Sequence, residues 1–302
     1  MELFNKVKST VDKTVKYVFK LEDNLIIEST YIDNNTGKDI ICIASQTMCA
    51  MGCTFCHLTD YLSKLKLRNL KHQEIVDSVN YICKDMNIGT GERPLLISYM
   101  GSGEPLLNLA NVQESMLTFM SEYSNIRFGL STMLPKEKWG TLFNMAQAVK
   151  KFKIPLKIHV SLHYTKDEQR NRMMPNATDI KATISALEFY KEITGNEVEV
   201  HYTLIKGEND TDEDGFNLVK LLDRRGIPIK FLRFNDKSTS PNKRTEMERI
   251  SIFRKGLELR GVKTEYYEPP GKDVGASCGQ FLFDQYEKNS ELDGIISESL
   301  VK

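Results

Sequence analysis

Short apolar runs alternate with amphipathic segments along most of the chain. The strand-like runs lie at residues 16–20, 25–28, 39–43, 95–100, 126–130, 156–162, 198–204 and 229–234. Between the later runs, apolar residues return at every third or fourth position, the period of a helix that buries one face. The helices predicted in this way cover residues 72–85, 109–122, 136–151, 179–193, 212–224 and 244–260. This order predicts an α/β fold with a parallel sheet and crossover helices, either a partial barrel or a doubly wound sheet.

Composition limits the class of protein. The 302 residues are 40% hydrophobic and 27% charged, and no apolar stretch approaches the length of about 18 residues that a membrane span requires. Lysine plus arginine (41) equals aspartate plus glutamate (41), so the formal net charge is zero. We therefore expect a soluble, cytoplasmic protein with no membrane partner. Contact with nucleic acid requires a local basic patch, and the candidates are residues 64–68, 150–153 and 243–244.

Cys49, Cys53 and Cys56 form a C-x3-C-x2-C run. Three thiolates can hold three irons of a four-iron cluster and leave the fourth iron open to another ligand. A structural zinc site usually pairs two C-x2-C knuckles, and a second knuckle is missing here. A disulfide framework is typical of a small secreted chain with a signal peptide, which this sequence does not resemble. The spacing favours an iron–sulfur cluster, with zinc and unliganded thiols as the alternatives.

The ends of the expected strands carry small and hydrogen-bonding residues. In both architectures, ligands bind beyond the carboxyl ends of the strands. The residues there include 100–105, 131–132, 161–163 and Asn235. Glu104 could accept hydrogen bonds from an ammonium group, although glycine and proline after a strand also form ordinary turns. This composition suits a small polar ligand next to the open iron.

The cysteine run and the Gly-Ser-Gly-Glu-Pro segment at 101–105 resemble those of radical S-adenosylmethionine (SAM) enzymes. In that superfamily, the amino and carboxylate groups of SAM chelate the open iron, and one-electron reduction releases a 5′-deoxyadenosyl radical. Further blocks are similar to the dual-specificity 23S rRNA and tRNA adenine-C2 methyltransferases and to their chloramphenicol–florfenicol resistance relative, which methylates adenine C8. These blocks are 42–49, 100–108, 130–132, 161–163, 167–170, 207–210 and 276–280.

This resemblance implies an architecture. It is a partial (β/α)6 TIM-like barrel of the radical SAM type at 41–282, with a small N-terminal β-hairpin extension at 1–40 and a C-terminal tail at 283–302. Family members also carry an N-terminal helical accessory domain that helps to hold RNA. Too few residues precede the strand at Lys16 to form it, so we expect this chain to lack that domain.

The resemblance also implies roles for two cysteines outside the cluster motif. Cys278 matches the cysteine whose sulfur is methylated by a first SAM; a radical then takes hydrogen from that methyl group, and the methylene adds to adenine. Cys42 matches the cysteine that removes the ring proton and then forms a disulfide with Cys278, both of which a thiolate can do. Glu28 resembles an acidic residue that assists proton transfer. Alternatively, Cys42 and Cys278 are small buried apolar residues without a catalytic role, as we expect Cys83 to be.

The implied cofactors are a [4Fe-4S] cluster on Cys49, Cys53 and Cys56, and SAM. The implied SAM contacts are Gly103, Glu104, Ser131, Ser161, Leu162, His163 and Asn235. The implied partners are RNA (rRNA or tRNA) as the substrate and an external electron donor, and no signal for an oligomeric state is present. Two other functions remain open: a methyl-cysteine enzyme that acts on a nucleotide or small heteroaromatic, and a non-catalytic iron–sulfur or zinc binding protein.

Overall fold

The sheet runs through the molecule in the order of the sequence. The structure, a computed structural model, describes the chain apart from residues 34–36, 137, 237–239 and 277–302. Its ten strands pair in the order β1 to β10. They are β1 (Glu2–Lys8), β2 (Val15–Lys20), β3 (Ile26–Ile32), β4 (Asp39–Cys42), β5 (Leu95–Tyr99), β6 (Ile126–Thr132), β7 (Leu156–Ser161), β8 (Val198–Leu204), β9 (Ile229–Arg233) and β10 (Thr264–Tyr267).

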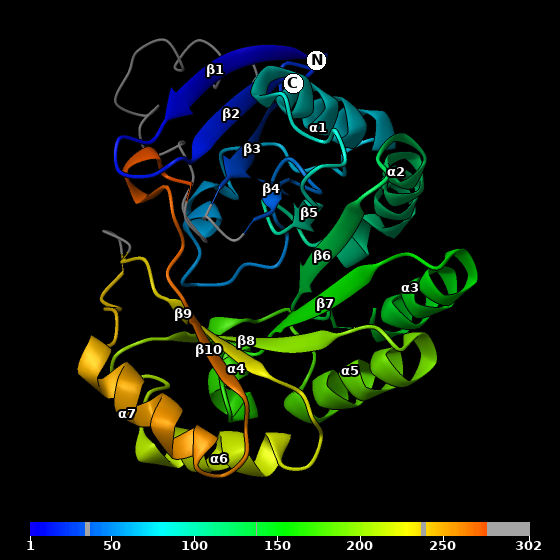
Figure 1. Ribbon diagram of the computed structural model, residues 1–302. Helices are drawn as coiled ribbons and strands as arrows, with labels where there is room; N and C mark the ends of the chain where they lie inside the picture. The colour runs from blue at the N-terminus through cyan, green and yellow to red at the C-terminus, as the bar shows by residue number, and fades with distance from the viewer. Residues whose placement is uncertain (34–36, 137, 237–239, 277–302) are drawn as a thin grey trace.

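The strands from β4 to β10 are parallel, and the helices cover the outside of the curved sheet (Figure 1). The α-helices are α1 (His72–Met86), α2 (Leu109–Glu122), α3 (Trp139–Phe152), α4 (Asp167–Met173), α5 (Ile180–Thr194), α6 (Asp212–Leu222) and α7 (Met247–Glu258). Three short 3-10 helices are η1 (His57–Tyr61), η2 (Pro105–Asn108) and η3 (Lys272–Val274). The predicted α/β partial barrel is confirmed.

The two-residue period of the strands separates the core from the barrel interior. On β7, Ile158 and Val160 are fully buried in the apolar core, whereas His159 and Ser161 line a cavity inside the barrel. The same alternation on β8 places Val200 in the core. Because successive side chains of a strand point to opposite faces, the apolar positions pack beneath the helices and the polar ones face the interior.

The N-terminal strands extend the barrel sheet. The strands β1 to β4 pair antiparallel, and β4 pairs parallel with β5, so the sheet continues without a break from the extension into the barrel. The extension has one more strand than expected, since β1 precedes the predicted pair. The proposed boundary near residue 40 stays a prediction, and the proposed tail at 283–302 lies outside the described residues. Within the described residues, no helix has both the length and the apolar character to cross a membrane.

Candidate functional site

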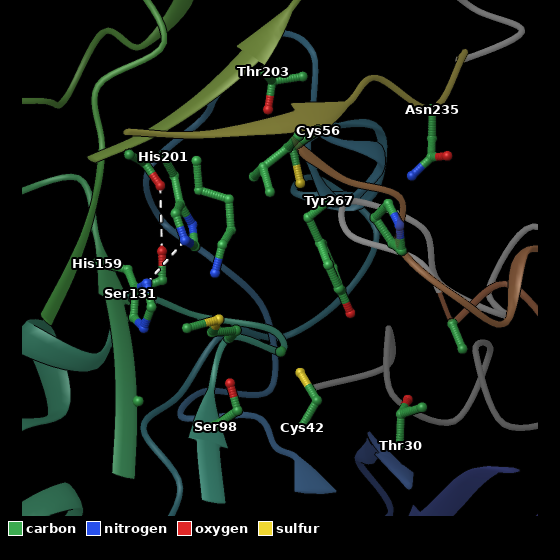
Figure 2. A pocket seen from close by; sticks show the side chains of 18 of the residues that line it. Thr30, Cys42, Cys56, Ser98, Ser131, His159, His201, Thr203, Asn235 and Tyr267 are labelled. Carbon is green, nitrogen blue, oxygen red and sulfur yellow. Dashed lines mark hydrogen bonds between the residues drawn. The ribbon is translucent and has the colours of Figure 1, made fainter. Parts of the chain in front are cut away.

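A cavity of about 430 Å³ lies inside the barrel, at the carboxyl ends of the strands. This volume is in the range of small-molecule sites. Its lining includes most residues that the sequence singled out: Glu28, Cys42, Cys49, Cys53, Cys56, Gly103, Ser131, Ser161, His163 and Asn235. Figure 2 shows the sulfur atoms of Cys42 and Cys56 pointing into the same space, with Asn235 at its edge. Cys278 lies outside the described residues.

The three cysteines of the motif lie on the loop between β4 and η1 and pack against an apolar shell. That shell contains Met51, Met133, Tyr164, Met173, Met174 and Ala177. Burial raises the pKa of the Cys49 thiol to about 12 and that of Cys53 well above its usual value, and the nearby Cys56 adds to both shifts. Such thiols keep their protons at neutral pH unless a cation replaces them. The all-sulfur donor set in a dry pocket therefore fits a metal cluster.

The turn after β5 is joined to the chain that leads into the cysteine loop. A Cβ atom on Gly101 would lie 2.7 Å from the Ile43 carbonyl carbon, and one on Gly103, whose φ is +100°, would lie 2.6 Å from Ser45 Oγ. The Glu104 amide donates to Gln46 Oε1 at 2.9 Å. The glycines are therefore required for this close approach, and the segment is both a turn and part of the cavity wall.

Two of the expected SAM contacts do not line the cavity. The Glu104 carboxyl is buried and accepts hydrogen bonds from the amides of Leu106 and Met133, both at 3.1 Å. The Leu162 amide donates to the His201 carbonyl at 3.0 Å, and its own carbonyl accepts from Arg170. Both residues hold the strand ends together, and their contact with SAM stays a prediction.

His163 is held as a neutral imidazole in the cavity wall. Its Nδ1 accepts a hydrogen bond from the Thr203 amide at 3.0 Å, so the ring proton resides on Nε2. Burial, with the charge of Arg170, lowers the pKa of His163 to about 3. The Phe55 ring of the cysteine loop packs edge-on against the imidazole, with 5.3 Å between ring centroids. His163 therefore offers one N–H donor beside the cysteine loop.

Glu28 forms a buried ion pair that the sequence did not predict. Its partner is the Lys16 ammonium on β2, which also donates to the Gly275 carbonyl at 2.5 Å. Both side chains are 3% exposed and both residues line the cavity. Cys42 is on the adjacent strand, where it pairs with Thr30, two residues from Glu28. Glu28 and Cys42, the two residues expected to move the proton, thus lie on neighbouring strands in the same wall of the cavity.

The segment that leads to Cys278 is anchored to the turn between β1 and β2. The Gly271 amide donates to Asp12 at 2.8 Å, and Asp273 accepts from the Ser9 hydroxyl and the Thr10 amide, both at 2.8 Å. Ala276, at the end of this segment, lines the cavity. The described chain therefore reaches the cavity two residues before Cys278 in the sequence.

Comparison with known proteins agrees with this geometry. The radical SAM superfamily model matches residues 43–219. A protein of Alkaliphilus oremlandii named probable dual-specificity RNA methyltransferase RlmN is 35% identical over 93% of this chain and 79% of its own length. A protein of the same name from Clostridioides difficile is 33% identical over 91% of this chain and 78% of its own length. This chain belongs to the RlmN family of radical SAM proteins.

A solved structure supports the radical SAM fold of this RlmN-family chain. The crystal structure of a radical SAM methyltransferase from Sphaerobacter thermophilus matches with a TM-score of 0.82 at 26% identity, covering 92% of this chain and 80% of that one. The structure of Streptococcus suis SuiB bound to SAM matches with a TM-score of 0.55 at 14% identity, covering 78% of this chain and 51% of that one. This second match supports the fold and nothing further.

A charged group of residues in this RlmN-family barrel went unrecognised in the sequence. His159 Nδ1 lies 2.9 Å from both Glu199 Oε2 and His201 Nε2 (Figure 2 shows the two rings). The three residues are spaced as metal ligands could be, but the ammonium groups of Lys157 and Lys230 lie 3.3 and 3.1 Å from Glu199. Because these cations already balance the carboxylate, we interpret the group as a buried charge network. Its sequence signal was the pair Glu199 and His201, which alternate with apolar residues on β8.

Proposed function

We propose that this protein is a radical SAM methyltransferase that methylates C2 of an adenine in RNA through a methyl group carried on Cys278. The observation that supports this most strongly is that one cavity is lined by the three motif cysteines, by Cys42 and Glu28, and by Ala276, two residues before Cys278. The relatives named dual-specificity RNA methyltransferases support RNA as the substrate class.

In this proposal, Cys49, Cys53 and Cys56 hold a [4Fe-4S] cluster, and an external donor supplies the electron. When bound, the cluster and SAM supply a 5′-deoxyadenosyl radical, which is needed because adenine C2 is too electron-poor to attack a sulfonium methyl group. Gly103 and the strand-end residues contact SAM at the cavity wall, and His163 offers its Nε2 proton as a donor.

The remaining residues handle the methyl group and the proton. The Cys278 sulfur takes the methyl group of one SAM by displacement, and S-adenosylhomocysteine leaves. After the radical takes a hydrogen atom from this methyl group, the methylene radical adds to adenine C2, and the adduct gives up one electron to the external carrier and the ring proton to Cys42. Once that proton has moved on, the Cys42 thiolate attacks the Cys278 sulfur, which forms the disulfide and breaks the S–CH2 bond, and the released carbon takes up a proton to become the methyl group of the base. Glu28, which is paired with the Lys16 ammonium, takes the proton onward from Cys42.

Basic residues line the cavity, namely Lys16, Lys38, Lys230 and Arg233. Three of them already bind carboxylates: Lys16 binds Glu28, Lys230 binds Glu199 and Glu265, and Arg233 binds Glu268. Arg68, in the predicted basic stretch 64–68, is likewise bound by Asp23 and Glu74. The proposal that the substrate is RNA therefore rests on the named relatives and not on the charge of this lining.

The proposal is tested by incubating anaerobically reconstituted protein with SAM, a reductant and rRNA or tRNA fragments, and measuring methylated adenosines by mass spectrometry after digestion. We expect 2-methyladenosine. Cys42→Ala should accumulate a covalent protein–RNA adduct, Cys278→Ala should form neither adduct nor product, and Cys83→Ala, which alters a buried thiol outside the cavity lining, should retain activity.

Other results would contradict parts of the proposal. 8-Methyladenosine would exclude the assigned ring position. SAM cleavage without methylation of any RNA would exclude RNA as the substrate, and turnover of a free nucleotide would then favour the small-molecule alternative. Normal turnover by Cys42→Ala would remove the role assigned to that thiol.

A further inference from the structure

Arg170, on the short helix α4, is a fully buried arginine with 0% exposure. Its Nε donates to the Thr178 carbonyl at 3.0 Å, and its Nη2 donates to the Met133 carbonyl at 3.2 Å. Its Nη1 donates to the carbonyls of Ser161, at 2.9 Å, and Leu162. Within the described part of the chain, no carboxylate oxygen lies within 4.0 Å of this guanidinium group.

A buried cation without a close anion needs a source of compensation. Carbonyl groups satisfy the N–H donors but carry no net charge, and an uncompensated buried charge destabilises a fold strongly. Burial lowers the pKa of Arg170 only to about 10, so the side chain stays charged at neutral pH. Arg68 shows the usual arrangement, because it binds two carboxylates.

Met133 connects Arg170 to the motif cysteines, because its carbonyl accepts from Arg170 Nη2 and its sulfur lies 3.9 Å from Cys53 Sγ. The carboxylates of Asp167 and Asp179 instead accept hydrogen bonds from the amides of Ile180 and Ala182 near the start of α5. The Arg170 partners Met133 and Met174 also belong to the apolar shell around the motif cysteines. The guanidinium group thus adjoins the predicted cluster site, with little solvent to screen its charge.

We propose that Arg170 is a positioning residue that balances the negative charge of the thiolate-bound cluster and thereby raises its reduction potential. The inference rests on the cluster assignment in the proposed function. A fixed positive charge in a dry environment stabilises the reduced, more negative form of a cluster. Its hydrogen bonds also join the chain after β6 to the end of β7, which fixes the strand ends that carry Ser131 and Ser161.

Three variants separate charge from hydrogen bonding. Arg170→Lys keeps the charge, Arg170→Gln keeps hydrogen-bond donors without the charge, and Arg172→Gln removes an arginine on the same helix whose side chain is 61% exposed. The midpoint potential of the reconstituted cluster is measured for each by an EPR-monitored reductive titration, with iron and sulfide content determined and folding checked by circular dichroism.

We expect the equilibrium constant for one-electron reduction to fall by about tenfold in Arg170→Gln, a shift of about 59 mV to more negative potential. Arg170→Lys and Arg172→Gln should stay near the wild-type value. A wild-type potential in fully loaded Arg170→Gln would overturn the inference, and so would an equal shift in Arg170→Lys. If Arg170→Gln does not fold, the test uses Arg170→Lys, and a shifted potential in that variant overturns the inference by itself.

The titration uses no RNA, so its result is independent of the substrate. A shifted potential in a protein that methylates no RNA would support the inference while contradicting the proposed substrate. A wild-type protein that binds no iron would overturn both the inference and the cluster assignment.

Discussion

The buried carboxyl group of Glu104 links the ends of two strands at the candidate site. Its oxygens accept hydrogen bonds from two backbone amides, one after β5 and one after β6. Burial raises the pKa of this carboxyl to about 7, because the charged form is poorly solvated. The folded protein therefore holds a proton on Glu104 at pH values where the unfolded chain has released it.

This difference predicts a pH dependence of stability. Since the folded pKa lies above the unfolded one, the contribution of Glu104 is fully present below about pH 4.5 and is lost as the pH rises through about 7. The total change is about 3 kcal/mol. We expect urea unfolding to show a smaller decline in stability between pH 5 and pH 8 in Glu104→Gln than in wild type. An identical decline in both proteins would contradict the shifted pKa.

At the level of residues, the sequence predicted what local spacing determines and missed what tertiary contacts determine. The motif cysteines and Gly103 are fixed by spacing and turn chemistry, and they line the cavity as expected. Lys16 and Lys230 were missed because their role depends on partners far along the chain. Glu104 sits at a strand end as predicted, but the direction of its side chain could be seen only in the fold.

The turn between β1 and β2 is hydrogen-bonded to the helix η3 and the residue before it. The turn supplies Asp12 and Thr10, and η3 supplies Asp273, while Lys16 on β2 binds the Gly275 carbonyl. In the proposed function, this connection brings the chain before Cys278 to the cavity. Both β1 and η3 escaped prediction: β1 is only half-buried and lacks an apolar run, and η3 has three residues.

Asp273→Ala should loosen this connection. The variant loses the hydrogen bonds from Ser9 and Thr10, which at an exposed site contribute about 1 kcal/mol. We expect backbone amide exchange in residues 271–276 to become about fivefold faster by hydrogen–deuterium exchange. Asp77→Ala, which alters a partly exposed carboxylate on α1 that bonds Gln73, serves as the control. Unchanged exchange in Asp273→Ala would mean that the turn does not hold the segment.

At the scale of the whole molecule, the hydrophobic pattern predicted most of the architecture. The predicted helices agree closely with α1, α2, α3, α5, α6 and α7. Each of these helices is amphipathic and buries its apolar face against the sheet, which produces the period seen in the sequence. The pattern missed α4, which has seven residues, and β10, a four-residue strand at the edge of the sheet that is not fully buried. Elements this short carry too few residues to show a period.

The central claim is that a single cavity joins a radical source to a methyl-carrying cysteine. The most direct measurement is peptide mass spectrometry of Cys278 in protein purified from cells, compared with Cys83 in the same sample. We predict one added methyl group on Cys278 and none on Cys83. Cys278 without a methyl group, in protein that nevertheless methylates its substrate, would contradict the account.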